Sequence, residues 1–450
     1  MYKKYLNVVE DKKTELFDLS DYLYDNPETC FEEHKAVEKI TGILQANGFQ
    51  IEYGVGGIPT AFRASFGEGK PHIGVLAEYD ALNGLSQVGE CPEEKQIEGE
   101  EKCHGCGHNL FAGGSVGAVL AIKEYVKEKG EGKVTLFGCP AEEGGAGKVY
   151  MAREGVFDGV DAVVSHHPEC FYMVRTRPSL ALVEVDYSFK GISAHAGASP
   201  DKGRSALDAV ELMNVGVNFL REHMPLSARV HYAIIDSGGR APNMVQSHAV
   251  VRYVIRDEDG KSVQELKRRV DRIAQGACLM TDTSVEEKVL SAYSNLITIP
   301  TLQKTANEVM HEVNLPVVTK EDLLYARALQ KGMKGVDENE PYSMTVLDPK
   351  PPVAHGGSTD TADVSWVCPT VQMHIGHWIK GTPAHTWQSA SQCRSNYAKN
   401  AMLYASKVVA GTAIRLMENR ELLQKAKEEH QEKTLGGYVC PIPSEIKPSH

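Results

Sequence analysis

The sequence predicts an α/β fold in which a main domain, with a mainly parallel sheet flanked by helices, carries a smaller inserted α+β domain. Three observations support this prediction. The chain has 450 residues, which is too long for one ordinary hydrophobic core. Short apolar runs alternate with helical patterns in its first third, and this pattern changes near residue 178. We therefore expect the main domain to comprise residues 1–178 and 295–450, and the inserted domain residues 179–294.

The elements of the main domain follow from the spacing of its apolar residues. Ala36, Ile40 and Leu44 recur at helical intervals, and Gly48 is a suitable C-terminal cap. Continuous apolar runs are typical of buried parallel strands. On these grounds we expect helices over 31–48, 113–127 and 418–433, and strands over 72–77, 133–139 and 160–165.

The inserted domain has a different pattern of apolar and polar residues. Residues 180–190 alternate between apolar and polar side chains, as a half-buried strand does. Further strands are expected over 229–236 and 247–256, and helices over 203–221 and 261–277. Two helices with several antiparallel strands predict a compact α+β unit.

Polar residues follow each of the three buried strands of the main domain. The first strand leads into Glu78-Tyr79-Asp80-Ala81-Leu82, the second into the Glu142-Glu143 pair, and the third into His166-His167-Pro168. The carboxyl ends of parallel strands meet at one edge of a sheet, which is where open α/β sheets place their sites. We therefore expect these side chains to lie together.

Residues 103–109 (Cys-His-Gly-Cys-Gly-His-Asn) and 140–145 (Pro-Ala-Glu-Glu-Gly-Gly) are the most informative motifs. Thiolate, imidazole and carboxylate groups all bind zinc-like metals. Two adjacent glutamates allow one to hold metal while the other stays free as a base, which is the combination that hydrolysis at a metal needs. His167 and His385 are further candidate ligands, although either could be an ordinary core or loop histidine.

Composition and charge restrict the partners. The formal net charge of −12 argues against a nucleic acid or a membrane surface as a partner. The chain has no run of ~18 apolar residues and begins with a charged sequence rather than a signal core. Ten scattered cysteines are typical of reduced thiols, so we expect a cytoplasmic protein.

Three rival interpretations stay open at this point. Residues 113–117 match the Gly-x-Ser-x-Gly pattern of serine hydrolases around Ser115, but no strand is expected directly before them. Cys103 and Cys106 form a Cys-x-x-Cys pair, which would suit a redox protein of a much shorter fold. A binding protein without catalysis is the third alternative, and the fold alone does not decide against it.

The motifs together resemble those of the di-metal aminoacylase and carboxypeptidase-G type metallopeptidase-amidohydrolases, and are most similar to the branch that contains the second of the two p-aminobenzoyl-glutamate hydrolase subunits. The resemblance runs from about residue 15 to the end of the chain. Besides the motifs already named, it includes 193–197 (Ser-Ala-His-Ala-Gly), 242–243 (Pro-Asn), 357–360 (Gly-Ser-Thr-Asp), 381–385 (Gly-Thr-Pro-Ala-His) and 438–443 (Tyr-Val-Cys-Pro-Ile-Pro).

The resemblance implies a role for individual residues. Two divalent metal ions, Zn or Mn, would be held by Cys106, His108, Glu143, His167 and His385. Glu142 would be the general base for a metal-bound hydroxide, and Asp80 would orient a metal-binding histidine. His195 would polarise the substrate carbonyl, often across a dimer, and Asn243 would lie near the substrate. The register between His166 and His167 stays open, and Asn109 replaces an aspartate that many relatives have.

The implied activity is hydrolysis of the amide bond of a small N-acyl amino acid, an aminobenzoyl-glutamate-like conjugate or a dipeptide. The inserted domain would be a lid that also forms a homodimer, although a homologous partner subunit is an alternative. The lid of such enzymes supplies groups that bind a substrate carboxylate. Its candidates are Arg204, Arg240, Arg252 and Arg256, and the sequence does not rank them.

Overall fold

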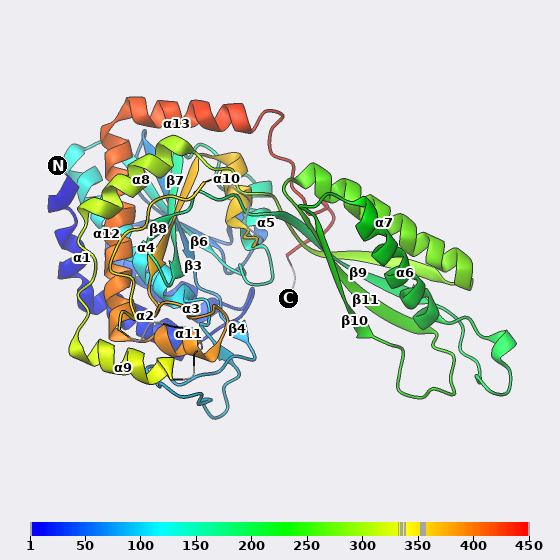
Figure 1. Cartoon of the computed structure of the whole chain (residues 1–450). Coiled ribbons are helices and arrows are strands. Elements are labelled where there is room, and N and C mark those ends of the chain that lie inside the picture. Colours follow the sequence, from blue (N-terminus) through cyan, green and yellow to red (C-terminus); the bar gives the residue numbers. More distant parts are fainter. Residues whose placement is uncertain (1, 332, 334–335, 337–338, 352–356, 449–450) are drawn as a thin grey trace.

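The computed structural model describes residues 2–331, 333, 336, 339–351 and 357–448. Two sheets form the centres of two bodies, and the chain passes from the larger body into the smaller one and back (Figure 1). The larger sheet is mixed, with a parallel centre flanked by helices, as the sequence predicts.

The larger sheet has seven strands in the order β1-β2-β6-β3-β7-β13-β8. The central strands β6, β3, β7 and β13 run parallel, while β1, β2 and β8 pair antiparallel at the edges. Their bounds are β1 Gln50–Tyr53, β2 Phe62–Glu68, β3 His72–Glu78, β6 Gly132–Cys139, β7 Ala162–Glu169, β8 Met173–Val174 and β13 Thr370–Gly376.

The register of this sheet places the motifs side by side. Glu78 at the end of β3 pairs with Cys139 at the end of β6, and His167 in β7 pairs with His374 in β13. The loops after β3 and β6 therefore leave the sheet together, next to the imidazole of His167. Every residue of β3 is buried, which accounts for its unbroken apolar sequence.

Helices cover both faces of the larger sheet. The long helices α4 (His108–Lys129) and α12 (Asn396–Glu418) pack against each other and on the sheet, with α2 (Lys13–Asp25) beside α4. A side chain at Gly113 or Gly117 of α4 would collide with α12, so these small residues permit the close packing. The other elements of this body are η1 Tyr2–Lys4, α1 Asn7–Asp11, α3 His34–Ala46, η2 Val55–Gly57, β4 Leu82–Asn83, β5 Lys102–Cys103, α5 Gly147–Arg153, α8 Pro300–Glu312, α9 Lys320–Gln330, α10 Thr361–Val367, α11 Trp387–Gln392 and α13 Arg420–Lys433.

The smaller sheet is antiparallel, in the order β10-β11-β9-β12. Helices α6 (Ala206–Leu220) and α7 (Gly260–Thr281) pack on it, and Ser205 and Asp259 cap their first turns. The strands are β9 Ala181–Lys190, β10 Arg229–Asp236, β11 His248–Asp257 and β12 Ser284–Tyr293, and the short turns η3 Pro200–Lys202 and η4 Arg221–His223 flank α6.

Several predicted boundaries were wrong by two to five residues, among them the end of α7, which is Thr281 and not residue 277. Two of these errors affect the site. Helix α4 begins at His108, not at residue 113, because Gly107 adopts a left-handed conformation (φ 80°) that starts the helix within the polar motif. Strand β7 continues to Glu169, so His166-His167-Pro168 lies inside the strand and not after it. Pairing with β13, which is distant in sequence, extends β7 beyond its apolar run. Among the described helices, none combines the length and apolar character needed to cross a bilayer.

Candidate active site

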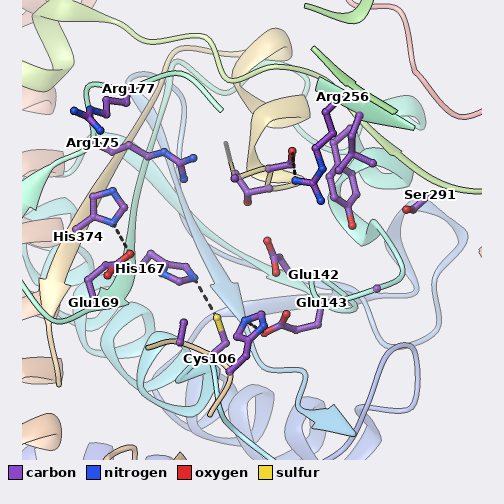
Figure 2. A pocket seen from close by; sticks show the side chains of 18 of the residues that line it. Cys106, Glu142, Glu143, His167, Glu169, Arg175, Arg177, Arg256, Ser291 and His374 are labelled. Carbon is purple, nitrogen blue, oxygen red and sulfur yellow. Dashed lines mark hydrogen bonds and ion pairs between the residues drawn. The ribbon is translucent and has the colours of Figure 1, made fainter. Parts of the chain in front are cut away.

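A cavity of about 790 Å³ opens where the carboxyl ends of the parallel strands face the smaller sheet. Figure 2 shows 18 of the residues that line it. The larger body contributes Cys106, Glu142, Glu143, His167 and His385 among others, and the smaller body contributes Leu182, Glu184, Val254, Arg256, Ser291 and Tyr293. The cavity thus has one wall of metal-ligand types and one wall from β9, β11 and β12.

The first group of ligand types is Cys106, His108 and His167, whose ligand atoms all lie within 4.8 Å of one another. The thiol sulfur of Cys106 is 3.6 Å from Nε2 of His167. Cys106 precedes α4 and His108 opens its first turn, so the helix start and the β7 strand bring the three together. The sharp turn between Cys106 and His108 needs a glycine at position 107, since a Cβ there would lie 3.0 Å from the Pro168 ring.

The second group shares the same thiol. Cys106, Glu143 and His385 also place their ligand atoms within 4.8 Å of one another, and Nε2 of His385 lies 3.4 Å from Oε1 of Glu143. His385 has a positive φ of 59°, and its backbone N–H donates to the carbonyl of Gly105. Two ligand groups that share one sulfur fit a pair of divalent ions, because sulfur, imidazole and carboxylate are all suitable donors.

The Asp80 carboxylate contacts residues of both ligand groups. One oxygen is 2.8 Å from Nδ1 of His108, and the other accepts the backbone N–H of Glu143 at 2.8 Å. With Nδ1 fixed, Nε2 of His108 faces the Glu78 carboxylate, whose nearer oxygen is 3.1 Å away. This is the orienting geometry that carboxylates give to metal-binding histidines.

Neighbouring charges set the protonation of this cluster. Burial opposes the charged form of His108, but the Cys106 and Asp80 side chains outweigh it and raise the pKa of His108 well above its ordinary value. Burial likewise opposes ionisation of Glu143, yet His385 and His108 hold its pKa below the usual range. The pKa of His167 falls to about 4, mainly through burial, so this imidazole is neutral and can donate a lone pair to a metal.

His166 and His167 point to opposite sides of β7, as successive strand residues do. The ring of His166 is buried against Phe111, with centroids 4.6 Å apart, and its Nε2 lies 3.5 Å from the Ser115 hydroxyl. Only His167 of the pair lines the cavity. The structure therefore places His167, and not His166, among the ligand types.

Glu142 lies next to these groups and lines the cavity. Burial and the nearby carboxylates of Glu78 and Glu143 raise its pKa well above the ordinary value. A carboxylate with a raised pKa is a better proton acceptor than an ordinary one, which suits a general base.

A buried ion cluster beneath Glu142 was missed by sequence reasoning. The Lys148 ammonium lies 2.7 Å from Glu78 and 2.6 Å from Asp360, and all three side chains are fully buried. The sequence offered one signal, a lysine four residues after Gly144 in a glycine-rich segment, but spacing alone does not reveal its burial. Arg175, Glu169 and His374 of the cavity wall were also missed, because none of them is part of a metal-ligand motif, although Glu169 directly follows His166-His167-Pro168.

The structure does not bring His195 or Asn243 to this cavity. Both are exposed, and they lie side by side in the smaller body, where the N–H of Ala196 donates to the carbonyl of Asn243.

Of the four candidate arginines, only Arg256 lines the cavity. Arg204 pairs with Asp282 and Arg252 with Asp186, while Arg240 lies on an exposed segment.

Two rival sites lose their geometric basis. Ser115 lies inside α4, fully buried, and its hydroxyl donates to the carbonyl of Leu76 at 2.6 Å, so it is no exposed nucleophile. Cys103 and Cys106 are both free thiols, and Cys103 is buried in the main core.

A model of the family described as Peptidase family M20/M25/M40 matches residues 74–405, well over half of the chain. The chain belongs to this family. It is therefore a metal-dependent hydrolase of the peptidase and amidohydrolase type that cleaves amide bonds, which confirms the resemblance seen in its motifs.

Two relatives of this M20 protein align over all or most of its length. The second of the two p-aminobenzoyl-glutamate hydrolase subunits of Escherichia coli (strain K12) is 41% identical over 475 aligned positions, covering 100% of this chain and 99% of that protein. Xaa-Arg dipeptidase of Mus musculus is 29% identical and covers 94% of this chain and 90% of its own length.

Solved M20 structures share the fold. An aminobenzoyl-glutamate utilization protein from Klebsiella pneumoniae superposes with a TM-score of 0.65 at 18% identity, covering 93% of this chain and 99% of its own. A dinuclear metal-binding M20 peptidase from Bacillus subtilis gives a TM-score of 0.61 at 19% identity, covering 91% of this chain and 99% of its own.

Proposed function

We propose that this M20 protein hydrolyses the amide bond of a small N-acyl amino acid, an aminobenzoyl-glutamate-like conjugate or a dipeptide. The observation that carries the proposal is the pair of ligand groups sharing Cys106, with Glu142 beside them in the same cavity. The names of two relatives, a p-aminobenzoyl-glutamate hydrolase subunit and a dipeptidase, agree with this range of substrates.

Cys106, His108, Glu143, His167 and His385 would hold two divalent ions in this proposal. Sulfur and imidazole suit zinc, and the carboxylate also admits manganese. Such ions, when bound, would lower the pKa of a water to roughly 7 and polarise the substrate carbonyl.

The protein's own groups carry the proton. Glu142 would accept it from the attacking water and return it to the departing amine, because burial and nearby carboxylates raise its pKa and so make it a stronger proton acceptor than an ordinary carboxylate. Asp80 would keep His108 in the tautomer whose Nε2 is free to bind a metal. Arg256, which reaches the cavity from β11 and donates to Ser358 at 3.4 Å, would bind a substrate carboxylate.

A homodimer would supply His195 and Asn243 from the partner's lid. The supporting observation is the edge strand β10, whose Tyr232, Ile234 and Ile235 side chains are exposed, with Phe219 of α6 73% exposed as well. An exposed apolar edge strand is a template for pairing with another chain. A homologous partner subunit is the second candidate, since two relatives from Escherichia coli are named as the two different subunits of one hydrolase.

Ten free cysteines fit a reducing compartment, so we place the protein in the cytoplasm.

The first experiment is a hydrolysis panel. The metal-stripped protein is assayed on N-acyl amino acids, aminobenzoyl-glutamate and dipeptides, before and after zinc or manganese is added back. We expect amino-acid release only after metal is restored, and a Glu142→Gln variant that binds the same amount of metal without turnover. Turnover without metal, or full turnover by Glu142→Gln, would contradict the proposal.

A further inference from the structure

Arg175 lies in the wall of the cavity that faces Arg256. It follows directly after β8, and its backbone N–H donates to the carbonyl of Gln372 at 3.0 Å. Its own carbonyl accepts a hydrogen bond from the Gln303 amide at 3.1 Å. The backbone is therefore held on both sides, and Figure 2 shows the guanidinium extended from this anchor toward the space in front of Arg256 and Glu142.

The guanidinium has no acidic partner among the residues that the structure describes. Nη1 of Arg175 donates to the neutral Oε1 of Gln372 at 2.7 Å, and within the described ranges no ion pair joins Arg175 to a carboxylate. Glu169 lines the same wall, but its Oε1 faces Nδ1 of His374 at 3.7 Å. Burial lowers the pKa of Arg175, against the pull of Glu142 and Glu169. A desolvated cation of this kind is stabilised by an anion that arrives with a ligand.

We propose that Arg175 is a specificity-determining residue that binds a second anionic group of the substrate, the side-chain carboxylate of a dicarboxylic amino acid. The inference rests on the proposed function, in which Arg256 takes the first carboxylate. Arg175 reaches into the cavity from the larger body and Arg256 from the smaller one, so the proposal places the two carboxylates of one amino-acid moiety at these two arginines (Figure 2).

The chemistry of arginine favours this role. A guanidinium offers five donors in a planar fork that matches a carboxylate. Gln372 occupies part of the fork and fixes its plane, which leaves the remaining N–H groups for the ligand. The acidic side chains of Glu142 and Glu143 lie beside the metal-ligand residues, at the other part of the cavity. A substrate carboxylate is therefore repelled there and attracted by the positive charge of Arg175.

The test compares two substrates that differ only in side-chain charge, N-acetyl-glutamate and N-acetyl-glutamine, on the metal-loaded full chain. We expect wild type to prefer the glutamate substrate. Arg175→Gln should lower kcat/KM for it by roughly 10- to 100-fold, the range of a charge-assisted hydrogen bond, and leave the glutamine substrate within about threefold. Arg175→Lys keeps the charge but loses the planar fork of donors, so its kcat/KM for the glutamate substrate should lie between those of wild type and Arg175→Gln.

Arg63→Gln is the matched control, because Arg63 is an exposed arginine of β2 paired with Glu52, outside the cavity. It should leave both substrates unchanged. Equal loss on both substrates in Arg175→Gln, or no preference for glutamate in wild type, would overturn the inference.

Calorimetry with glutarate separates this inference from the proposed function. If wild type hydrolyses neither N-acetyl amide, glutarate binding decides the role of Arg175, and the proposed function is judged separately by the full substrate panel. Binding that weakens by at least about tenfold in Arg175→Gln, at unchanged metal content and melting temperature, supports the anion site. Equal binding by both proteins, or none by wild type, overturns it.

Discussion

Asp80 and His108 form a fixed pair, with a carboxylate oxygen 2.8 Å from Nδ1 of the buried imidazole. The second oxygen of Asp80 accepts the backbone N–H of Glu143. One side chain at the end of β3 therefore sets the position of ligand types on two other segments, the start of α4 and the loop after β6.

Asp80→Asn should weaken metal binding by roughly 10- to 100-fold, because an amide in this place no longer favours the required tautomer of His108. The measurement is metal retention against a chelator series, read alongside thermal unfolding. Metal affinity equal to that of wild type would show that Asp80 does not act through His108.

Asn109→Asp should destabilise the fold by about 3 kcal/mol. The Asn109 amide donates to the Ser20 hydroxyl at 3.0 Å and to the carbonyl of Cys393 at 2.9 Å. A carboxylate would face these oxygens as an acceptor in a fully buried position. Denaturant unfolding of the variant at neutral pH checks this. A midpoint unchanged from wild type would mean that the site rearranges to accept the charge.

Lys148→Met should destabilise the fold by about 3–5 kcal/mol, since it leaves Glu78 and Asp360 buried without their cation. A second variant, Lys148→Met with Glu78→Gln and Asp360→Asn, removes the charges together and should recover part of the loss. Denaturant unfolding of the two variants measures the difference. If the triple variant were less stable than the single one, the uncompensated charge would not be the cause.

The parts of this protein that the sequence predicts are those with local signals. Strands β3 and β6 were placed to within one residue because unbroken apolar runs mark buried parallel strands. The end of β7 was misplaced because its pairing partner, β13, lies some two hundred residues away. Arg175 and Lys148 were missed for a related reason, since the partners that define them come from β13 and from α10's N-terminus.

The His195 position leads to a prediction about assembly. His195 is exposed and outside the cavity of its own chain, so in the proposed homodimer it would serve the partner's site. Glu142→Gln and His195→Ala should each be inactive as purified proteins. Mixed and reassociated in equal amounts, they should recover roughly a quarter of wild-type activity, because half of the dimers are mixed and each then has one complete site. No recovery, with exchange of subunits verified, would place His195 in its own chain's site or outside catalysis.

Burial of His72 predicts an acid-sensitive fold. Burial, and then Lys133 and Lys70, lower the pKa of His72 from 6.5 to about 4, while its Nε2 lies 2.8 Å from the Thr135 hydroxyl. Between these two values the unfolded chain binds a proton that the folded chain does not. Stability contributed by neutral His72 is therefore complete above pH 6.5 and is lost as pH falls toward about 4, by up to about 3 kcal/mol.

The His72→Gln variant keeps a neutral polar side chain and removes this titration. The difference in unfolding free energy between wild type and variant should change by about 1.4 kcal/mol per pH unit inside the window from 6.5 to 4, and stay constant above it. Denaturant unfolding at half-unit pH steps gives this difference, in which the other titrating groups of the chain cancel. Parallel stability curves for the two proteins across the window would mean that His72 accepts its proton in the folded state as readily as in the unfolded one.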